Sequence, residues 1–297
     1  MTGAAEITRA LRGRWYGRYG LAFCPAHGNW RTPALRLADG AGGRLLAFCS
    51  AGCEFRDVIA ALRDRGLAGG GVAPIPDPVR EAAALHAARA EREAGTRRAR
   101  NLWAEGLPAA GTLVEAYLRA RAIRAGIPPT LRFAANAWHP SARRLPAMLT
   151  AVERVGEAGM VSLHRTYLAE PGRKAEIERP KAMLGPVAGG AARLSDGPGP
   201  LVVAEGIETA LTVLDDLAGL RPRVWAGLSA SGVAGLRLPR DAGELVVAPD
   251  AEPAGRAAAQ ALADRADALG WRVRVLPPPE DASDWNDVAQ AEREAGR

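Results

Sequence analysis

Apolar residues in the last hundred positions fall into short runs that alternate with helical stretches. The strand-like runs are LVVAEG at 201–206, VWAGL at 224–228, ELVVAPD at 244–250 and WRVRVLP at 271–277, and helical patterns lie between them at 207–220 and 254–270. Short apolar runs separated by helices are typical of a parallel α/β sheet. In such sheets functional groups gather at the carboxyl ends of the strands, and here two strands end in the acids Glu205 and Asp250.

The first two thirds of the chain predict smaller elements. Strands are expected at 44–49, 147–155 and 160–168, and amphipathic helices at 55–65 and 113–121. The middle of the chain therefore predicts a small α+β subdomain.

A segment rich in glycine and proline, GLAGGGVAPIPDP at 66–78, can hold neither helix nor strand and predicts an interdomain linker. The composition of 79–105 is rich in alanine, arginine and glutamate, which favours a helix with a solvated face. The predicted organisation has four parts: a cysteine-bearing module at 1–68, the linker and helix at 69–105, the α+β subdomain at 106–196, and the α/β domain at 197–297.

Charge is divided unevenly along the 297 residues. Positions 1–200 hold 29 Lys and Arg against 17 Asp and Glu, a balance of +12, whereas positions 201–297 hold 10 against 16, a balance of −6. This division suits a protein that binds a polyanion with its first part and collects carboxylates around metal ions in its last part, although ordinary surface charge is the alternative. No long apolar run or signal-like N-terminus is present, so we expect a cytoplasmic protein with no membrane partner.

Lysine is rare in this chain. Of 39 basic residues only Lys174 and Lys181 are lysines, and they stand seven positions apart. A site that needs a compact point charge would retain lysine where arginine otherwise prevails. A solvated surface position is the alternative for Lys174, because GRKAE is typical of a turn.

The three cysteines form two pairs of candidate metal ligands. Cys24 and His27 are separated by two residues, and Cys49 and Cys53 by three. Two such knuckles with thiolate and imidazole ligands favour a tetrahedral zinc ion, and a closed set of four ligands makes the zinc structural. Unmetallated core cysteines are the alternative.

Arginines and aromatic residues interleave around these ligands. Cations for phosphates and rings for bases suit single-stranded nucleic acid, with Arg12, Arg14 and Trp15 as candidate contacts. The alternative is that the rings pack a small domain that has few other hydrophobes. The same stretch also contains Arg9, Arg18, Arg31, Tyr16, Tyr19, Phe23 and Trp30.

Acidic residues follow the predicted strands of the last domain. Asp250 and Glu252, at i and i+2, present two carboxylates to one side of an extended segment, and Glu205 ends the other strand. Oxygen ligands favour Mg²⁺ or Mn²⁺. A third acidic loop at 281–287 either completes the site or caps the last helix through Asp284 or Asn286.

These motifs carry a resemblance to a known family. VVAEGIETAL, VVAPDAEPAG and DWNDV resemble the Toprim domain of bacterial-type primases, topoisomerases and some nucleases. CPAH and CSAGC look like the zinc-binding domain in front of bacterial and phage primases. In the middle, YLRARAI, PPTLRF, HRTYL and RPKAMLGP are similar to the core of phage- and plasmid-type primases. The resemblance implies a zinc ribbon, a primase-like α+β core and a Toprim parallel sheet.

The resemblance also implies roles for individual residues. Glu205 matches the Toprim glutamate, a general acid/base or metal ligand, and Asp250 and Glu252 match the metal-binding acid pair. Glu252 departs from the more usual aspartate, and Glu208 stands where primases often have aspartate. The three-residue gap between Cys49 and Cys53 departs from the usual two.

The implied activity is that of a DNA primase, which joins ribonucleoside triphosphates into short RNA primers on single-stranded DNA. Two divalent ions, Mg²⁺ or Mn²⁺, would activate the 3′-hydroxyl and stabilise the leaving pyrophosphate. Arg165, Lys174 and Lys181 are the candidates for contacts with the triphosphate and template. No P-loop motif GxxxxGK[ST] occurs, so a replicative helicase would act in trans, and a stand-alone mobile-element enzyme is equally compatible.

Two other functions stay open from the sequence. A metal-dependent Toprim nuclease could use the same acids, and a catalytically degenerate Toprim protein could use the zinc module and basic core for nucleic-acid binding alone. A topoisomerase is disfavoured, because none of Tyr16, Tyr19, Tyr117 and Tyr167 lies in an obvious nucleophile context.

Overall fold

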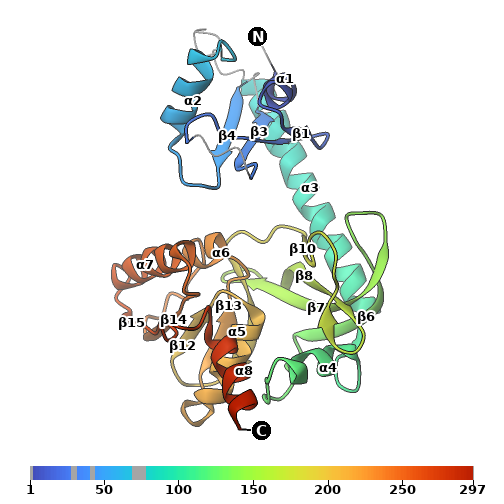
Figure 1. Ribbon diagram of the computed structural model, residues 1–297, viewed down its shortest axis with the longest axis vertical. Coiled ribbons are helices and arrows are strands. Elements are labelled where there is room, and N and C mark those ends of the chain that lie inside the picture. The colour runs from blue at the N-terminus through green and yellow to red at the C-terminus, as the bar shows by residue number, and fades with distance from the viewer. Residues whose placement is uncertain (1–2, 28–31, 41–43, 69–77, 297) are drawn as a thin grey trace. The chain divides into compact units, whose positions relative to one another are not determined.

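A computed structural model describes residues 3–27, 32–40, 44–68 and 78–296 (Figure 1). The chain divides into two compact units, Met1–Ala90 and Glu91–Arg297. Positions 69–77 of the predicted linker lie outside the described residues, as do Trp30 and Arg31.

The first unit is built on a four-stranded antiparallel sheet whose strands follow chain order. Leu35 and Leu37 alternate with the exposed Arg36, so one face of the sheet is buried. The helices supply Ile7 and Leu62 to the same core. Its elements are α1 (Ala4–Ala10), β1 (Arg14–Trp15), β2 (Gly20–Ala22), β3 (Leu35–Asp39), β4 (Leu45–Cys49) and α2 (Phe55–Asp64).

The long helix α3 (Pro78–Glu105) leads into the second unit, which begins with an antiparallel part. Strands β7 and β8 form its central hairpin, which confirms the two strands predicted around the GEAG turn. This part contains β5 (Leu107–Pro108), α4 (Leu113–Ala120), β6 (Leu131–Trp138), β7 (Arg144–Arg154), β8 (Met160–Ala169), β9 (Arg173–Lys174), β10 (Lys181–Leu184) and β11 (Gly190–Asp196).

The rest of the second unit is the predicted alternation of strands and helices. The fully buried β12 lies at its centre, as expected for a parallel strand covered on both faces. This part contains β12 (Leu201–Ala204), α5 (Ile207–Asp216), the 3₁₀ helix η2 (Ala218–Leu220), β13 (Arg223–Ala226), α6 (Ala230–Ala234), β14 (Glu244–Ala248), α7 (Pro253–Asp267), β15 (Arg272–Val275) and α8 (Trp285–Ala295).

One continuous sheet joins the two parts of the second unit, because β11 pairs with β7 on one side and with β13 on the other. Its order is β10-β8-β7-β11-β13-β12-β14-β15, and the last four strands are parallel. From β12 the chain crosses to β13 on one side and then to β14 on the other. The neighbouring strands β12 and β14 therefore flank a topological switch point, where α/β proteins bind ligands.

Helices cover both faces of the parallel strands (Figure 1). Residues of α5 and Trp285 of α8 share one apolar core, while residues of α7 and the segment around α6 share the other. The parallel α/β fold predicted for the last hundred residues is thus confirmed. None of the helices in the described part of the chain has the length and apolar character needed to cross a lipid bilayer.

Candidate active site and metal centres

The carboxyl ends of β12 and β14 place two acids side by side. These strands pair in parallel register, with Ala204 opposite Ala248. Glu205 follows β12 directly, and Asp250 follows β14 after one proline. The site thus arises from two apolar strands that are buried because both faces of the sheet are covered.

A glycine at the start of α7 fixes the Asp250 loop. A Cβ atom at Gly255 would lie 2.7 Å from the Asp250 carbonyl oxygen, which is closer than the two atoms can approach. The Ala251 N–H also donates to the Ser283 carbonyl at 2.8 Å. The loop that carries Asp250 is therefore held by the helix on one side and by the 281–284 segment on the other.

A pocket of about 100 Å³ opens between these acids and the antiparallel strands. Cationic and acidic side chains face each other across it, and its walls come from α4, β8, β9, β10, α5 and the strand ends. It is lined by Arg121, His164, Lys174, Lys181, Glu205, Gly206, Ile207, Glu208, Thr209, Leu228, Asp250 and Asp284.

The acids of the pocket lie close enough to oppose each other's ionisation. Burial and the neighbouring Glu205 and Asp284 carboxylates raise the pKa of Asp250 to about 7. Burial and the nearby Glu252 carboxylate also raise the pKa of Glu205 above its ordinary value. The Oδ1 atom of Asp250 is buried, and it has no hydrogen-bond partner among the described residues. Crowded carboxylates with one unpaired oxygen fit a hard divalent cation. Among the described residues, no hydrogen-bond donor occupies the position beside Oδ1 of Asp250 that such an ion would take.

Glu208 is not a member of this acidic group. Its side chain is buried, and Oε1 lies 3.3 Å from the Lys174 ammonium while Oε2 lies 3.3 Å from that of Lys181. The buried Tyr117 hydroxyl of α4 donates a short hydrogen bond to Oε1. Burial alone would raise the pKa of Glu208, but Lys181, Lys174 and Tyr117 outweigh it and hold that pKa well below its ordinary value.

Both lysines of the chain therefore converge on one carboxylate. Lys174 is about one-third exposed, and burial lowers its pKa while Glu208 opposes that shift. This pairing disagrees with the alternative of a solvated surface position for Lys174. Burial and the nearby Lys181 lower the pKa of His164 to about 4, so its imidazole is neutral at pH 7. Two ammonium groups beside a neutral histidine make a pocket wall suited to phosphate.

The acidic loop before α8 does cap the helix. The Asp284 Oδ1 atom accepts hydrogen bonds from the backbone N–H groups of Asn286 and Asp287 at 2.7 and 2.9 Å, which confirms the cap interpretation. Asp284 also lines the pocket. The buried Asn286 amide donates to the Arg121 carbonyl and to Thr212, so it joins α8 to α4 and α5.

Two predicted site residues lie outside the pocket lining. Glu252 is exposed at the N-cap of α7, where its charge still raises the pKa of Glu205. Arg165 is only 5% exposed, and it donates to the carbonyls of Trp138 and Met183. These bonds link β8 to β10, its neighbour in the sheet, and to the end of β6, and they favour a structural role for Arg165.

The four predicted zinc ligands come together in the first unit. The ligand atoms of Cys24, His27, Cys49 and Cys53 all lie within 4.8 Å of one another, and Nδ1 of His27 lies 3.1 Å from the Cys53 sulfur. Burial raises the pKa of Cys24 to about 12, so this sulfur becomes a stable thiolate only beside a cation. The Cys₃His set fits a structural zinc ion of a zinc ribbon.

The predicted nucleic-acid contacts of this unit have different surroundings. Arg12 and Arg14 are exposed, and Arg14 lies over the ring of Tyr16 with 5.5 Å between guanidinium carbon and ring centre. Trp15 is partly buried against the core of the unit, which agrees with the alternative that the aromatic rings pack this small domain.

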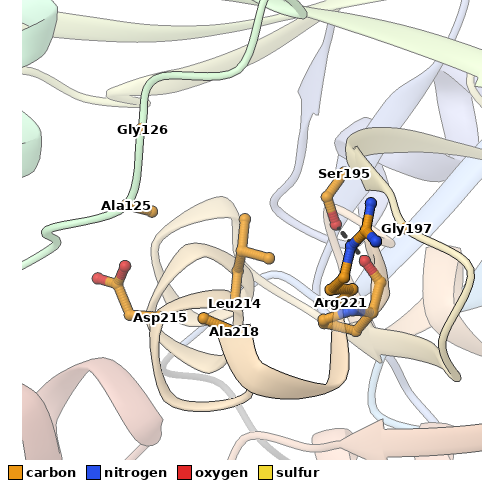
Figure 2. Close-up of a pocket in the computed structure, with 9 residues that line it drawn as sticks. Ala125, Gly126, Ser195, Gly197, Leu214, Asp215, Ala218 and Arg221 are labelled. Atoms are coloured by element: carbon orange, nitrogen blue, oxygen red, sulfur yellow. Dashed lines mark hydrogen bonds between the residues drawn. The ribbon is translucent and has the colours of Figure 1, made fainter.

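A second pocket lies at the amino ends of β12 and β13, opposite to the carboxyl ends that carry the acids. In Figure 2, Ala125 and Asp215 lie at one side of the pocket and Ser195 and Arg221 at the other, with Leu214 of α5 between them. Its volume is about 270 Å³, larger than the pocket at the strand ends. It brings no pair of carboxylates together with lysines, so size alone does not identify the candidate active site.

Three residues of the site were not predicted as such from the sequence. Tyr117 and Glu208 bond to each other although 91 positions separate them, and His164 reaches the pocket from the middle of β8. The isolated lysine pair was the sequence signal that pointed here. The Nδ1 atom of the buried His164 has no hydrogen-bond partner among the described residues, which indicates that this atom faces a ligand.

Comparison with known families places two segments of the second unit. The parallel α/β fold with the acids Glu205 and Asp250 at its switch point defines a ligand-binding class of α/β domain. Residues 200–295 match the family model of the Toprim domain, so this part of the chain is a Toprim domain. Residues 93–194 match a model described as a domain of unknown function, DUF7146.

Solved structures that resemble the chain include phage and bacterial primases. The primase fragment of the bacteriophage T7 primase-helicase protein is 16% identical, with 92% of this chain and 95% of that chain covered and a TM-score of 0.40. The Aquifex aeolicus primase, with its zinc-binding and RNA polymerase domains, is 12% identical over 97% and 80% of the two chains, with a TM-score of 0.39. A comparison with curated proteins finds no match.

Proposed function

We propose that the protein is a primase-like nucleotidyltransferase that makes short RNA primers on single-stranded DNA. The observation that carries the proposal is the pocket at the ends of β12 and β14, where Glu205 and Asp250 of the Toprim domain face Lys181 of β10. Two further features favour a primase over a Toprim nuclease or topoisomerase. They are the zinc-ligand set in the first unit and the order of motifs along the chain.

Glu205 and Asp250 would hold Mg²⁺ or Mn²⁺, with Glu252 at the rim. Bound there, the ions would supply Lewis acidity for attack of a 3′-hydroxyl on an α-phosphate and for release of pyrophosphate. The unpaired Oδ1 of Asp250 and the raised pKa values of both acids support their role as ligands.

The residues opposite the acids would bind the triphosphate. Lys181 reaches the pocket from β10 with its side chain 40% exposed, so its ammonium contacts solvent as well as Glu208. A compact cation can pair with a phosphate oxygen while the buried Glu208 keeps it in place. The neutral His164 and the Arg121 guanidinium line the same wall and would donate hydrogen bonds to the same group.

Primer synthesis on single-stranded DNA tests the proposal. Purified protein is given labelled ribonucleoside triphosphates with Mg²⁺ or Mn²⁺, and the products are separated by length. We expect short RNA products that depend on template and metal. Degradation of the template without product would support a Toprim nuclease, and DNA binding without either reaction would support a binding protein. Either result would refute the proposal.

A further inference from the structure

A wide groove of the second unit carries a dense set of arginines outside the carboxylate pocket. Its volume is about 930 Å³, against about 100 Å³ for that pocket. Five arginines and two glutamates line it, so the lining is strongly positive. The full lining is Arg92, Glu93, Thr96, Arg97, Arg100, Arg154, Glu157, Pro186, Val187, Ala188 and Arg237.

Close packing and hydrogen bonds hold α3, which carries one wall of this arginine groove, against the antiparallel part. A Cβ atom at Gly95 would lie 3.1 Å from the Gly185 Cα, so α3 and the β10–β11 connection approach each other closely at these two glycines. The Thr96 hydroxyl donates to the Val161 carbonyl at 2.8 Å, and Nε of Arg100 donates to the Met160 carbonyl at 3.0 Å. Helix α3 is thereby fixed alongside β8 with one helical stripe facing the groove.

Loop carbonyls and an acid hold the opposite wall. Arg154 donates to the carbonyls of Pro186 and Ala188, and it pairs with Glu157 at 2.8 Å. Arg237 also contacts Glu157, at 3.4 Å, and packs against Gly189. Two arginines on the α3 stripe have no such partner, because Arg92 and Arg97 are exposed and form no ion pair within the described ranges.

The groove connects structurally with the carboxylate pocket through two elements. The β10–β11 connection, whose Pro186 and Ala188 line the groove, follows the strand that carries Lys181. Helix α6 begins where the Ala230 backbone bonds the Glu205 side chain, and Arg237 of the groove follows its end. The β10–β11 connection and the segment around α6 therefore each join a residue of the groove to a residue near the carboxylate pocket.

We propose that the arginine groove binds the sugar-phosphate backbone of a single nucleic-acid strand, the template under the proposed function. Cationic side chains without an aromatic ring among the lining residues suit phosphates and offer no stacking surface for bases. An opening of this size takes several linked nucleotides, whereas a single phosphate would leave most of the arginines unused. The groove would give affinity without sequence preference.

The test compares strand binding by the full-length wild type and an Arg92→Ala/Arg97→Ala variant. Binding of a labelled single-stranded DNA is followed by fluorescence anisotropy from about 50 to 200 mM salt. Loss of two phosphate contacts should weaken binding about tenfold at low salt and reduce the slope of log K against log salt by about 1.4. Arg240→Ala/Arg274→Ala, which removes two exposed arginines of the Toprim domain, should leave both quantities unchanged.

A strand of abasic nucleotides separates backbone contacts from base contacts. The difference between wild type and the Arg92→Ala/Arg97→Ala variant should persist on this strand, since the groove contacts no bases. Equal binding by both proteins, or a difference that vanishes on the abasic strand, would overturn the proposal. The single variant Arg97→Glu, with its melting temperature measured, guards against a folding defect. The binding measurement tests the groove alone and does not depend on primer synthesis. A failure of the proposed function would appear only in the primer-synthesis measurement.

Discussion

Glu208 shows how a single buried carboxylate can organise a site without belonging to its metal ligands. Two lysines and one tyrosine from three different elements reach it, and none of them is near it in sequence. Because its charge is fully desolvated, the pairing is stable only while every partner is present. The lysines are thus held beside the carboxylates of Glu205 and Asp250 without pairing with them.

We predict that Glu208→Gln destabilises the protein by about 2 kcal/mol. The change leaves two partly buried ammonium groups without their counter-charge, and their partial exposure reduces the cost below that of a fully buried pair. Chemical denaturation at pH 7 measures the effect. Glu244→Gln is the control, since it breaks an exposed ion pair with Arg272 and should change stability by less than about 0.5 kcal/mol.

The same variant has a predicted pH dependence. The folded state holds the pKa of Glu208 below its ordinary value of 4.5, so the unfolded chain binds the extra proton first as the pH falls. The contribution of Glu208 to stability is therefore complete above about pH 5 and is lost on acidification below it. The stability gap between wild type and Glu208→Gln should narrow between pH 6 and pH 3, and a constant gap would contradict the assigned pairing.

At the scale of single elements, the start of α7 is the part that positions Asp250. The helix begins directly after the acidic segment, and Gly255 lets its first turn approach the Asp250 carbonyl. A methyl group there must push the loop or the helix away, because the opposing atom is backbone and cannot rotate aside.

We predict that Gly255→Ala lowers both stability and metal-dependent activity. The cost of forcing the extra atom into this contact is about 1–3 kcal/mol, measured as a lower melting temperature. Gly219→Ala in η2 is the matched control, because a Cβ atom there meets nothing within 4 Å. Equal behaviour of the two variants would show that the α7 contact does not set the position of Asp250.

The zinc-ligand cluster gives the second element-scale prediction. Cys49→Ser should reduce bound zinc from about one ion per chain to near zero and unfold the first unit locally, because the ion completes a small core. Elemental analysis of dialysed protein measures the metal content. The neighbouring Ser50→Ala should keep the ion, and retention of zinc by Cys49→Ser would contradict the Cys₃His assignment.

The strands that end in Glu205 and Asp250 could be predicted because apolar runs buried on both faces leave a strong pattern. The pattern was weaker in β10 and β11, where KAML and GAARLSD mix polar and small residues, and these strands were not predicted. The lysine pair indicated a site, but its partner Glu208 could not be found from spacing. That pairing exists only because folding brings the ammonium groups of β9 and β10 to Glu208 in the first turn of α5.

For the second unit as a whole, the sheet is the feature that joins chemistry to binding. Strand β11 links the antiparallel part to the Toprim domain, so lysines from one side meet carboxylates from the other. Neither part alone contains both the lysines and the strand-end carboxylates of the pocket. We therefore predict that catalysis requires the acid that follows β14 and the cation of β10 in one continuous structure.

The most direct measurement is primer synthesis by Asp250→Asn beside wild type and Asp267→Asn. The amide keeps the shape of Asp250 but removes the charge that would hold the metal, whereas Asp267 lies on the exposed side of α7. We predict that Asp250→Asn loses at least about 100-fold in product while it keeps single-stranded DNA binding, and that Asp267→Asn matches wild type. Wild-type synthesis by Asp250→Asn would contradict the claim that this pocket carries out nucleotidyl transfer.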